Sequence, residues 1–219
     1  MSGIRTAVAT RTSTGDAAQA RALHRRALRL EWFTVAWNIV EAVVAVGAGV
    51  AAGSIALVGF GADSLIEVTS GGMLVWRLRR AGPEASAEEQ GDPERKALFV
   101  VGGTFFLLAV YVAYESLSEL LGVREAKAST AGLALSVASL IVMPVLATAK
   151  LRVARAMGSR ALHADAMETW VCAYLSAALL VGLALNAALG WWWADAVAGL
   201  AMLPVMLWQG WETLGDARR

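Results

Sequence analysis

The sequence is short of charge, cysteine and proline, and each shortage argues against a class of protein. Charged residues make up 17% of the 219 residues, whereas a soluble domain of this size carries about a quarter. Because 58% of the residues are apolar, neither an ordinary soluble enzyme nor a disordered chain fits. The single cysteine excludes an internal disulfide and a zinc module built on several cysteines. With only four prolines, a collagen-like chain is excluded as well.

Sequence signatures of enzymes and nucleotide-driven motors are missing too. No GxxxxGK[ST] motif is present, so any transport is passive or driven by an ion gradient. HExxH and GxSxG are absent, so we do not expect an enzyme. Residues 1–31 contain six arginines but no apolar core long enough for a signal peptide.

Six stretches are apolar and long enough to cross a bilayer, which takes roughly 20 helical residues. The expected fold class is therefore an all-α membrane protein with six transmembrane helices in one domain, residues 32–213. Gly53-Ser54 joins the first two stretches. The predicted spans are Trp32–Ala52, Ile55–Leu78, Ala97–Leu121, Thr130–Ala149, Ala164–Leu189 and Trp191–Thr213.

The segments outside this domain are polar. We expect residues 1–31 to form a basic tail that is solvated and partly disordered. The alternative is that Ala18–Leu30 forms a basic amphipathic helix on a membrane surface. Residues 79–96 contain two prolines and an acidic run, which predicts a loop. Residues 214–219 are expected to be a short second tail.

Basic residues are distributed unevenly between the two sides of the predicted bundle. If both termini lie inside the cell, seventeen of the 19 lysines and arginines are on the inner side, and only Arg124 and Lys127 are outside. Cytoplasmic loops are characteristically rich in lysine and arginine. We therefore expect a multi-pass protein of the plasma or inner membrane with both termini in the cytoplasm.

The predicted spans contain acidic residues that have no basic partner within them. The spans hold no lysine, and their one arginine, Arg77, lies at an inner edge. A charged side chain at the bilayer centre costs on the order of 2.5–3.5 kcal/mol. These acids are therefore expected to be protonated, to face water or to hold a cation, which predicts a cation pathway. They are Glu41, Asp63, Glu67, Glu115, Glu119, Asp165, Glu168, Asp195 and Glu212.

Two helical stripes are expected to bring candidate metal ligands to a similar depth. Asp63 and Glu67 are four residues apart, as are Glu168 and Cys172, so each pair shares one helix face. A weak repeat, Gly-Ser-x-Ala-Leu, begins ten residues before each pair, at residues 53 and 158. Three carboxylates and a thiolate would make a four-ligand site for a divalent transition metal between the second and fifth spans.

These residues and this topology resemble the cation diffusion facilitator family. Asp63 and Glu67 stand where the family has Asp or His and then Asp. Asp165-x-x-Glu168-x-x-x-Cys172 stands where the family commonly has Asp-x-x-His-x-x-x-Asp. The predicted sixth span also resembles the sixth span of the family. The resemblance implies a six-helix bundle that exports a divalent metal from the cytoplasm in exchange for protons.

Two departures from the family pattern bear on the metal and on assembly. The predicted ligands include no histidine, and Cys172 replaces a carboxylate. A thiolate suits zinc, cobalt or cadmium, whereas carboxylates suit manganese or iron(II), so the metal stays open with a preference for zinc-like ions. We expect no cytoplasmic C-terminal domain of the kind most members use to dimerise. A homodimer is then expected to form through the membrane helices.

The expected mechanism couples metal to protons without a tightly bound cofactor. Metal ligands bind as deprotonated groups, so metal binding releases protons. The emptied site takes protons back, because burial disfavours uncompensated negative charge. The expected partners are the metal ion and the lipid bilayer, with no nucleic acid. The rival function is a non-transporting membrane scaffold or a metal-binding regulatory protein.

The remaining candidate residues each have two interpretations. Cys172 is either a ligand or a small buried apolar residue. Asp165 either belongs to an entrance and proton relay or caps the fifth helix. His163 either relays protons or metal or lies on the surface. Glu41 and Asp195 either line the pathway or bond neighbouring helices.

Overall fold

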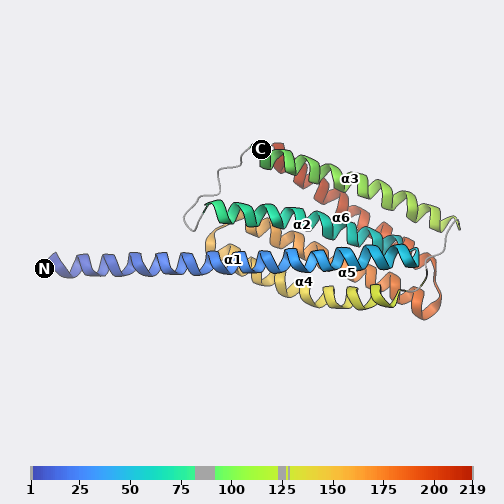
Figure 1. The fold of residues 1–219 in the computed structure, drawn as a ribbon, viewed down its shortest axis with the longest axis horizontal. Helices are drawn as coiled ribbons and strands as arrows, with labels where there is room; N and C mark the ends of the chain where they lie inside the picture. Colours follow the sequence, from blue (N-terminus) through green and yellow to red (C-terminus); the bar gives the residue numbers. More distant parts are fainter. Residues whose placement is uncertain (1, 82–91, 123–126, 128, 219) are drawn as a thin grey trace.

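The computed structural model describes residues 2–81, 92–122, 127 and 129–218. Six α-helices contain nearly all of these residues, and no strand occurs among them. The helices lie side by side along one long axis, and the first half of α1 projects beyond the others (Figure 1). They are α1 (Ser2–Ala52), α2 (Ile55–Ala81), α3 (Asp92–Leu120), α4 (Thr130–Met157), α5 (Arg160–Leu189) and α6 (Trp193–Arg218).

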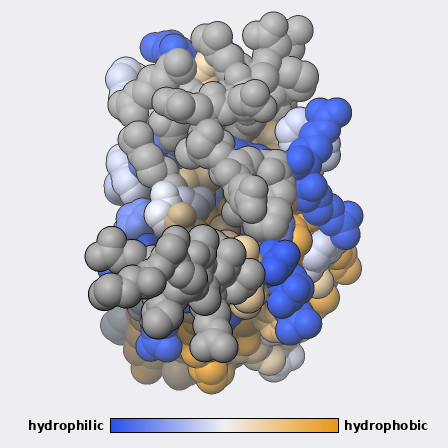
Figure 2. Space-filling model, turned by 90° about the vertical axis from the view of Figure 1, so that its left-hand side faces the viewer, coloured by the Kyte–Doolittle hydropathy of each residue, from blue (hydrophilic) through white to orange (hydrophobic). Residues whose placement is uncertain are grey.

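Both chain termini lie at one end of the bundle, which we call the terminal end; the opposite end is the far end (Figure 1). α1, α3 and α5 run from the terminal end to the far end, and α2, α4 and α6 return. Figure 2 looks onto the terminal end, where hydrophilic side chains gather and hydrophobic atoms show at the edge.

Two of the hairpin turns are built from the same local sequence. Gly53 (φ 69°) and Gly158 (φ 62°) adopt the left-handed conformation, which glycine tolerates without a steric penalty. The serine after each glycine then caps the next helix. The hydroxyls of Ser54 and Ser159 accept hydrogen bonds from the backbone N–H three residues on, at 3.2 and 3.3 Å. The repeated Gly-Ser is therefore a signal that ends one helix and begins the next.

The helices associate in sequence-distant as well as neighbouring pairs. The largest contacts are those of α1 with α2, α3 with α6 and α4 with α5, and α2 also contacts α5 and α6. The core between them is apolar and includes Phe60, Met143, Leu175, Leu179 and Met202. This arrangement brings α2 and α5, which carry the predicted ligands, into direct contact.

The outer surface of the bundle is suited to lipid. By length and composition, three stretches of the described chain could cross a membrane, namely Ala17–Ala52, Thr130–Met157 and Ala161–Leu189. Large apolar side chains also face outward from several helices, which is unusual for a water-soluble protein. Examples are Val43, Val50, Leu107, Val145 and Val181.

The helices extend further at the terminal end than hydropathy predicts. The tail predicted as partly disordered is helical from Ser2 onward and continuous with the first span. α4 continues beyond its predicted end at Ala149 to Met157. Charged residues interrupt the apolar sequence after Ala149, but the buried face of the helix continues through Lys150, Val153 and Ala154. The predicted loop 79–96 is shorter in the structure, because α2 extends to Ala81 and α3 begins at Asp92. Residues 82–91 and Arg124 lie outside the described part of the chain.

Candidate metal site

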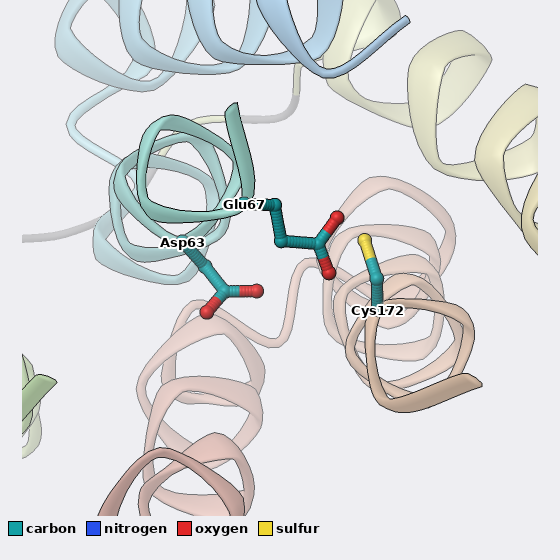
Figure 3. A group of neighbouring side chains, drawn as sticks. All are labelled: Asp63, Glu67 and Cys172. Atoms are coloured by element: carbon teal, nitrogen blue, oxygen red, sulfur yellow. The ribbon is translucent and has the colours of Figure 1, made fainter. Parts of the chain in front are cut away.

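Three of the four predicted ligands come together between α2 and α5. Asp63, Glu67 and Cys172 each offer one ligand atom, and these atoms all lie within 4.8 Å of one another. All three residues are buried. In Figure 3 the Glu67 carboxylate extends from α2 toward the Cys172 sulfur on α5, with the Asp63 carboxylate beside it. We call these three residues the Asp63 group.

Three of the four carboxylate oxygens in the Asp63 group lack a hydrogen-bond partner within the described residues. Neither oxygen of Asp63, nor Oε1 of Glu67, has a hydrogen-bond partner within the described residues. The other Glu67 oxygen accepts a 2.6 Å hydrogen bond from Nδ2 of Asn38 on α1. Buried polar atoms are almost always paired, and leaving a buried charge unpaired is costly. A bound cation or bound protons would satisfy these oxygens.

The fourth predicted ligand is held elsewhere. Glu168 accepts a 3.0 Å hydrogen bond from the hydroxyl of Ser70 on α2, and it is not part of the three-residue group. It lies one helical turn before Cys172 on α5 and is only half-buried. The structure therefore brings Glu168 to the same pair of helices without placing it among the other candidate ligands.

Glu41 is fully buried and accepts hydrogen bonds from three helices. Trp37 on α1 donates at 2.7 Å and Ser64 on α2 at 3.4 Å, and Ser139 on α4 makes a third, short hydrogen bond. Its carboxylate thus ties α1 to α2 and α4 next to the Asp63 group. Unlike Asp63, it has a donor for each oxygen.

Asp195 lies at the far end, where it joins α6 to the start of α2. One oxygen accepts a 2.6 Å hydrogen bond from the Ser54 hydroxyl, and the other accepts a 3.2 Å bond from the backbone N–H of Ala56. These contacts satisfy donors at the first turn of α2, as a capping carboxylate does.

Two further features lie at opposite ends of the bundle. His163 is exposed in the first turn of α5 at the terminal end. At the far end a cavity of about 170 Å³ is lined by residues of α1, α2 and α3, including Ser54, Tyr111, Glu115 and Glu119. Its remaining lining is mostly apolar, and Glu119 is buried beside it.

The expectation that the membrane acids have no basic partner is wrong for Asp165. Lys150 of α4 is fully buried and forms a short ion pair with Asp165. The expectation failed because it placed Lys150 in a loop after Ala149, whereas α4 continues through it. Its spacing gave a signal, because Lys150 follows the buried Met143 and Ala147 at steps of four and three on one helix face.

Comparisons with known proteins agree with this architecture. A family model of the cation efflux transmembrane domain matches residues 32–219. Transmembrane protein 163 of Xenopus laevis is 23% identical over 202 residues, which cover 90% of this chain and 69% of that protein. The family match includes α1 from Trp32 onward, all of α2 to α6 and the Asp63 group. This all-helical membrane bundle therefore belongs to the cation efflux family, whose members transport divalent cations.

Proposed function

We propose that this chain exports a divalent transition metal from the cytoplasm in exchange for protons. The carrying observation is the Asp63 group, where ligand atoms from two helices lie within 4.8 Å of one another and three carboxylate oxygens lack partners. The metal is the transported substrate. It binds Asp63, Glu67 and Cys172 and passes between the two membrane faces as the helices around the site rearrange.

The ligand set favours a metal that accepts both hard and soft donors. Two carboxylates suit manganese or iron(II), whereas a thiolate selects softer ions such as zinc, cobalt or cadmium. We place zinc-like ions first because Cys172 is the only group of the three that discriminates strongly among divalent metals. In this proposal Glu168 leaves Ser70 and completes a four-ligand site when the metal binds.

Proton exchange follows from the same residues. The carboxylates and the thiol must be deprotonated to bind a metal, so loading the site releases protons. After the metal leaves on the other side, the buried groups take up protons, since negative charge without a cation is disfavoured there. His163, Asp165, Glu41 and Asp195 are the proposed secondary relay or pathway positions. Of these, His163 lies at the terminal end, where we place the cytoplasm.

The arrangement in the cell is proposed on the same grounds. The excess of basic residues on the terminal side favours cytoplasmic termini in a plasma or inner membrane. The apolar outer faces of the helices leave surface for a homodimer within the bilayer.

The direct test is flux measured in vesicles of purified protein. Vesicles containing a metal-sensitive dye and a pH dye receive external zinc, cadmium or manganese, and both signals are followed. Wild-type protein is expected to carry metal one way and protons the other, and Asp63→Ala is expected to abolish both signals. Glu212→Gln serves as the control, because this acid is exposed on α6 away from the site.

Two results would refute the proposal. Equal flux through Asp63→Ala and wild-type vesicles would show that the site is misplaced. Metal binding to wild-type protein without any flux would favour the regulatory or scaffold function instead.

A further inference from the structure

A second buried cluster of charge lies between α1, α4 and α5. The Lys150 ammonium lies 3.3 Å from both oxygens of Glu31 and forms a short ion pair with Asp165. It is also 3.3 Å from the Thr169 hydroxyl. Lys150 and Glu31 are fully buried, and Asp165 and Thr169 are nearly so. We call these four residues the Lys150 cluster.

The Lys150 cluster lies on the terminal side of the Asp63 group. Asp165 precedes Cys172 by seven residues on α5, and Glu31 precedes Asn38, the partner of Glu67, by seven residues on α1. Both helices start from the terminal end, and seven residues of helix span about 10 Å. Two independent helices therefore place the cluster about 10 Å closer to the terminal end than the Asp63 group.

The shell around the ammonium has the chemistry of a cation site. Two carboxylates and a hydroxyl converge on one point, and all are oxygen donors of the kind that bind hard divalent cations such as manganese, magnesium or calcium. Unlike the Asp63 group, this shell contains no sulfur. The tethered ammonium occupies the position at which these oxygens converge.

We propose that Lys150 is a built-in cation that fills a second, oxygen-lined cation site on the terminal side of the bundle. Its ammonium keeps mobile divalent ions out of this site. The role in transport rests on the proposed function: an ion entering from the terminal end meets no competing carboxylate site and reaches the Asp63 group. The occupancy of the site by Lys150 does not depend on transport.

The test removes the ammonium and asks whether a metal takes its place. In a background with the Asp63 group disabled by Asp63→Asn, Glu67→Gln and Cys172→Ser, binding of manganese to purified protein is measured by electron paramagnetic resonance. The background alone is expected to bind none. Adding Lys150→Ala is expected to create one manganese site per chain. Adding Lys150→Arg, which keeps the positive charge, is expected to create none.

A further substitution assigns the ligands. Asp165→Asn, added to the background with Lys150→Ala, is expected to weaken manganese binding at least tenfold. Absence of manganese binding after Lys150→Ala would overturn the proposal, as would binding that Asp165→Asn leaves unchanged.

Loss of the buried ammonium can also unfold the protein, so folding is followed in parallel. If the Lys150→Ala protein is unstable, manganese is expected to raise its unfolding temperature and to leave that of the Lys150→Arg protein unchanged. Glu31→Gln combined with Lys150→Ala removes one unpaired charge and is expected to fold while keeping weaker binding. If manganese stabilises neither the Lys150→Ala protein nor the Glu31→Gln/Lys150→Ala protein, the proposal is contradicted. Failure of the proposed function is seen separately, as wild-type vesicles that carry no metal.

Discussion

Two buried acidic clusters lie about 10 Å apart along the helices and differ in how their charge is compensated. In the Lys150 cluster, Glu31 and Asp165 surround an ammonium of the same chain. In the Asp63 group, three carboxylate oxygens face no donor within the described residues. Buried carboxylates alone therefore do not distinguish the proposed metal site from the rest of this bundle. The distinguishing feature is the absence of an internal counter-charge.

The largest expected effect comes from removing the compensating charge. Lys150→Ala leaves two buried carboxylates unpaired, and breaking a buried ion pair in this way typically destabilises a protein by about 3–5 kcal/mol. Unfolding of purified protein in detergent, followed by circular dichroism, measures this loss. Adding Glu31→Gln and Asp165→Asn is expected to restore much of the stability. A stable Lys150→Ala protein would mean that the ion pairs contribute little.

The complementary change acts on the uncompensated cluster. Asp63→Asn removes a carboxylate that has no hydrogen bonds to lose, so its effect on folding is expected to be neutral or favourable. Metal affinity is expected to fall by more than about 100-fold, beyond what loss of a supporting residue costs. Isothermal titration with zinc and thermal unfolding on the same sample separate the two readouts. If Asp63→Asn greatly lowers the unfolding temperature and leaves the zinc affinity unchanged, Asp63 is a structural residue like those of the Lys150 cluster.

Loss of the residue that orients Glu67 is expected to have a smaller effect. Asn38 donates a 2.6 Å hydrogen bond to Glu67, and residues that support metal ligands typically contribute about 10- to 100-fold in affinity. Asn38→Ala is expected to weaken zinc binding at the low end of this range. The variant Ser118→Ala, at an exposed hydroxyl that donates to the α3 backbone at Tyr114, is a matched control. Equal affinities for both variants would show that the Asn38 bond is not coupled to the site.

Replacing the sulfur is expected to change preference more than affinity. Cys172→Ser exchanges a soft ligand for a hard one, so affinity for cadmium and zinc falls relative to manganese, by about tenfold. Competition between these ions for the purified protein gives the ratio directly. An unchanged ratio would identify Cys172 as a packing residue.

The smallest expected effect is at the far end. Ser54 caps α2 and donates to Asp195, and loss of such a cap costs about 1 kcal/mol. Ser54→Ala is expected to lower the unfolding temperature slightly and to leave the order of metal preference unchanged, as measured in the same competition. A changed order of preference would mean that the contacts of Ser54 at the far end influence metal binding at the Asp63 group.

Helical periodicity and spacing were sufficient to predict the six helices and the three candidate ligands that the structure brings together. Asp63, Glu67 and Cys172 could be found because each pair lies four residues apart and the Gly-Ser turns set a common count from the start of each helix. These are local properties, and hydrophobic length and helix period report them directly.

The contacts that could not be predicted join residues far apart in the chain. Lys150 meets Glu31 across 119 residues and Ser70 meets Glu168 across 98, and both depend on how the helices pack. Hydropathy ended α4 at Ala149 because charged residues follow it, although the helix continues to Met157. A lysine next to a predicted boundary was therefore counted as solvated when it is buried.

The two Gly-Ser turns have a geometric consequence for the proposed metal site. One lies at each end of the bundle, and Glu67 and Cys172 each come thirteen residues after the capping serine, which is about 20 Å of helix. Glu67 and Cys172 thus lie at the same distance from opposite ends of the bundle, and because α2 and α5 are antiparallel the two side chains come together near its middle. An insertion or deletion of one residue between either serine and its candidate ligand would rotate that ligand by about 100° and separate Glu67 from Cys172. In the proposed function, the lengths of these two helical segments are therefore constrained.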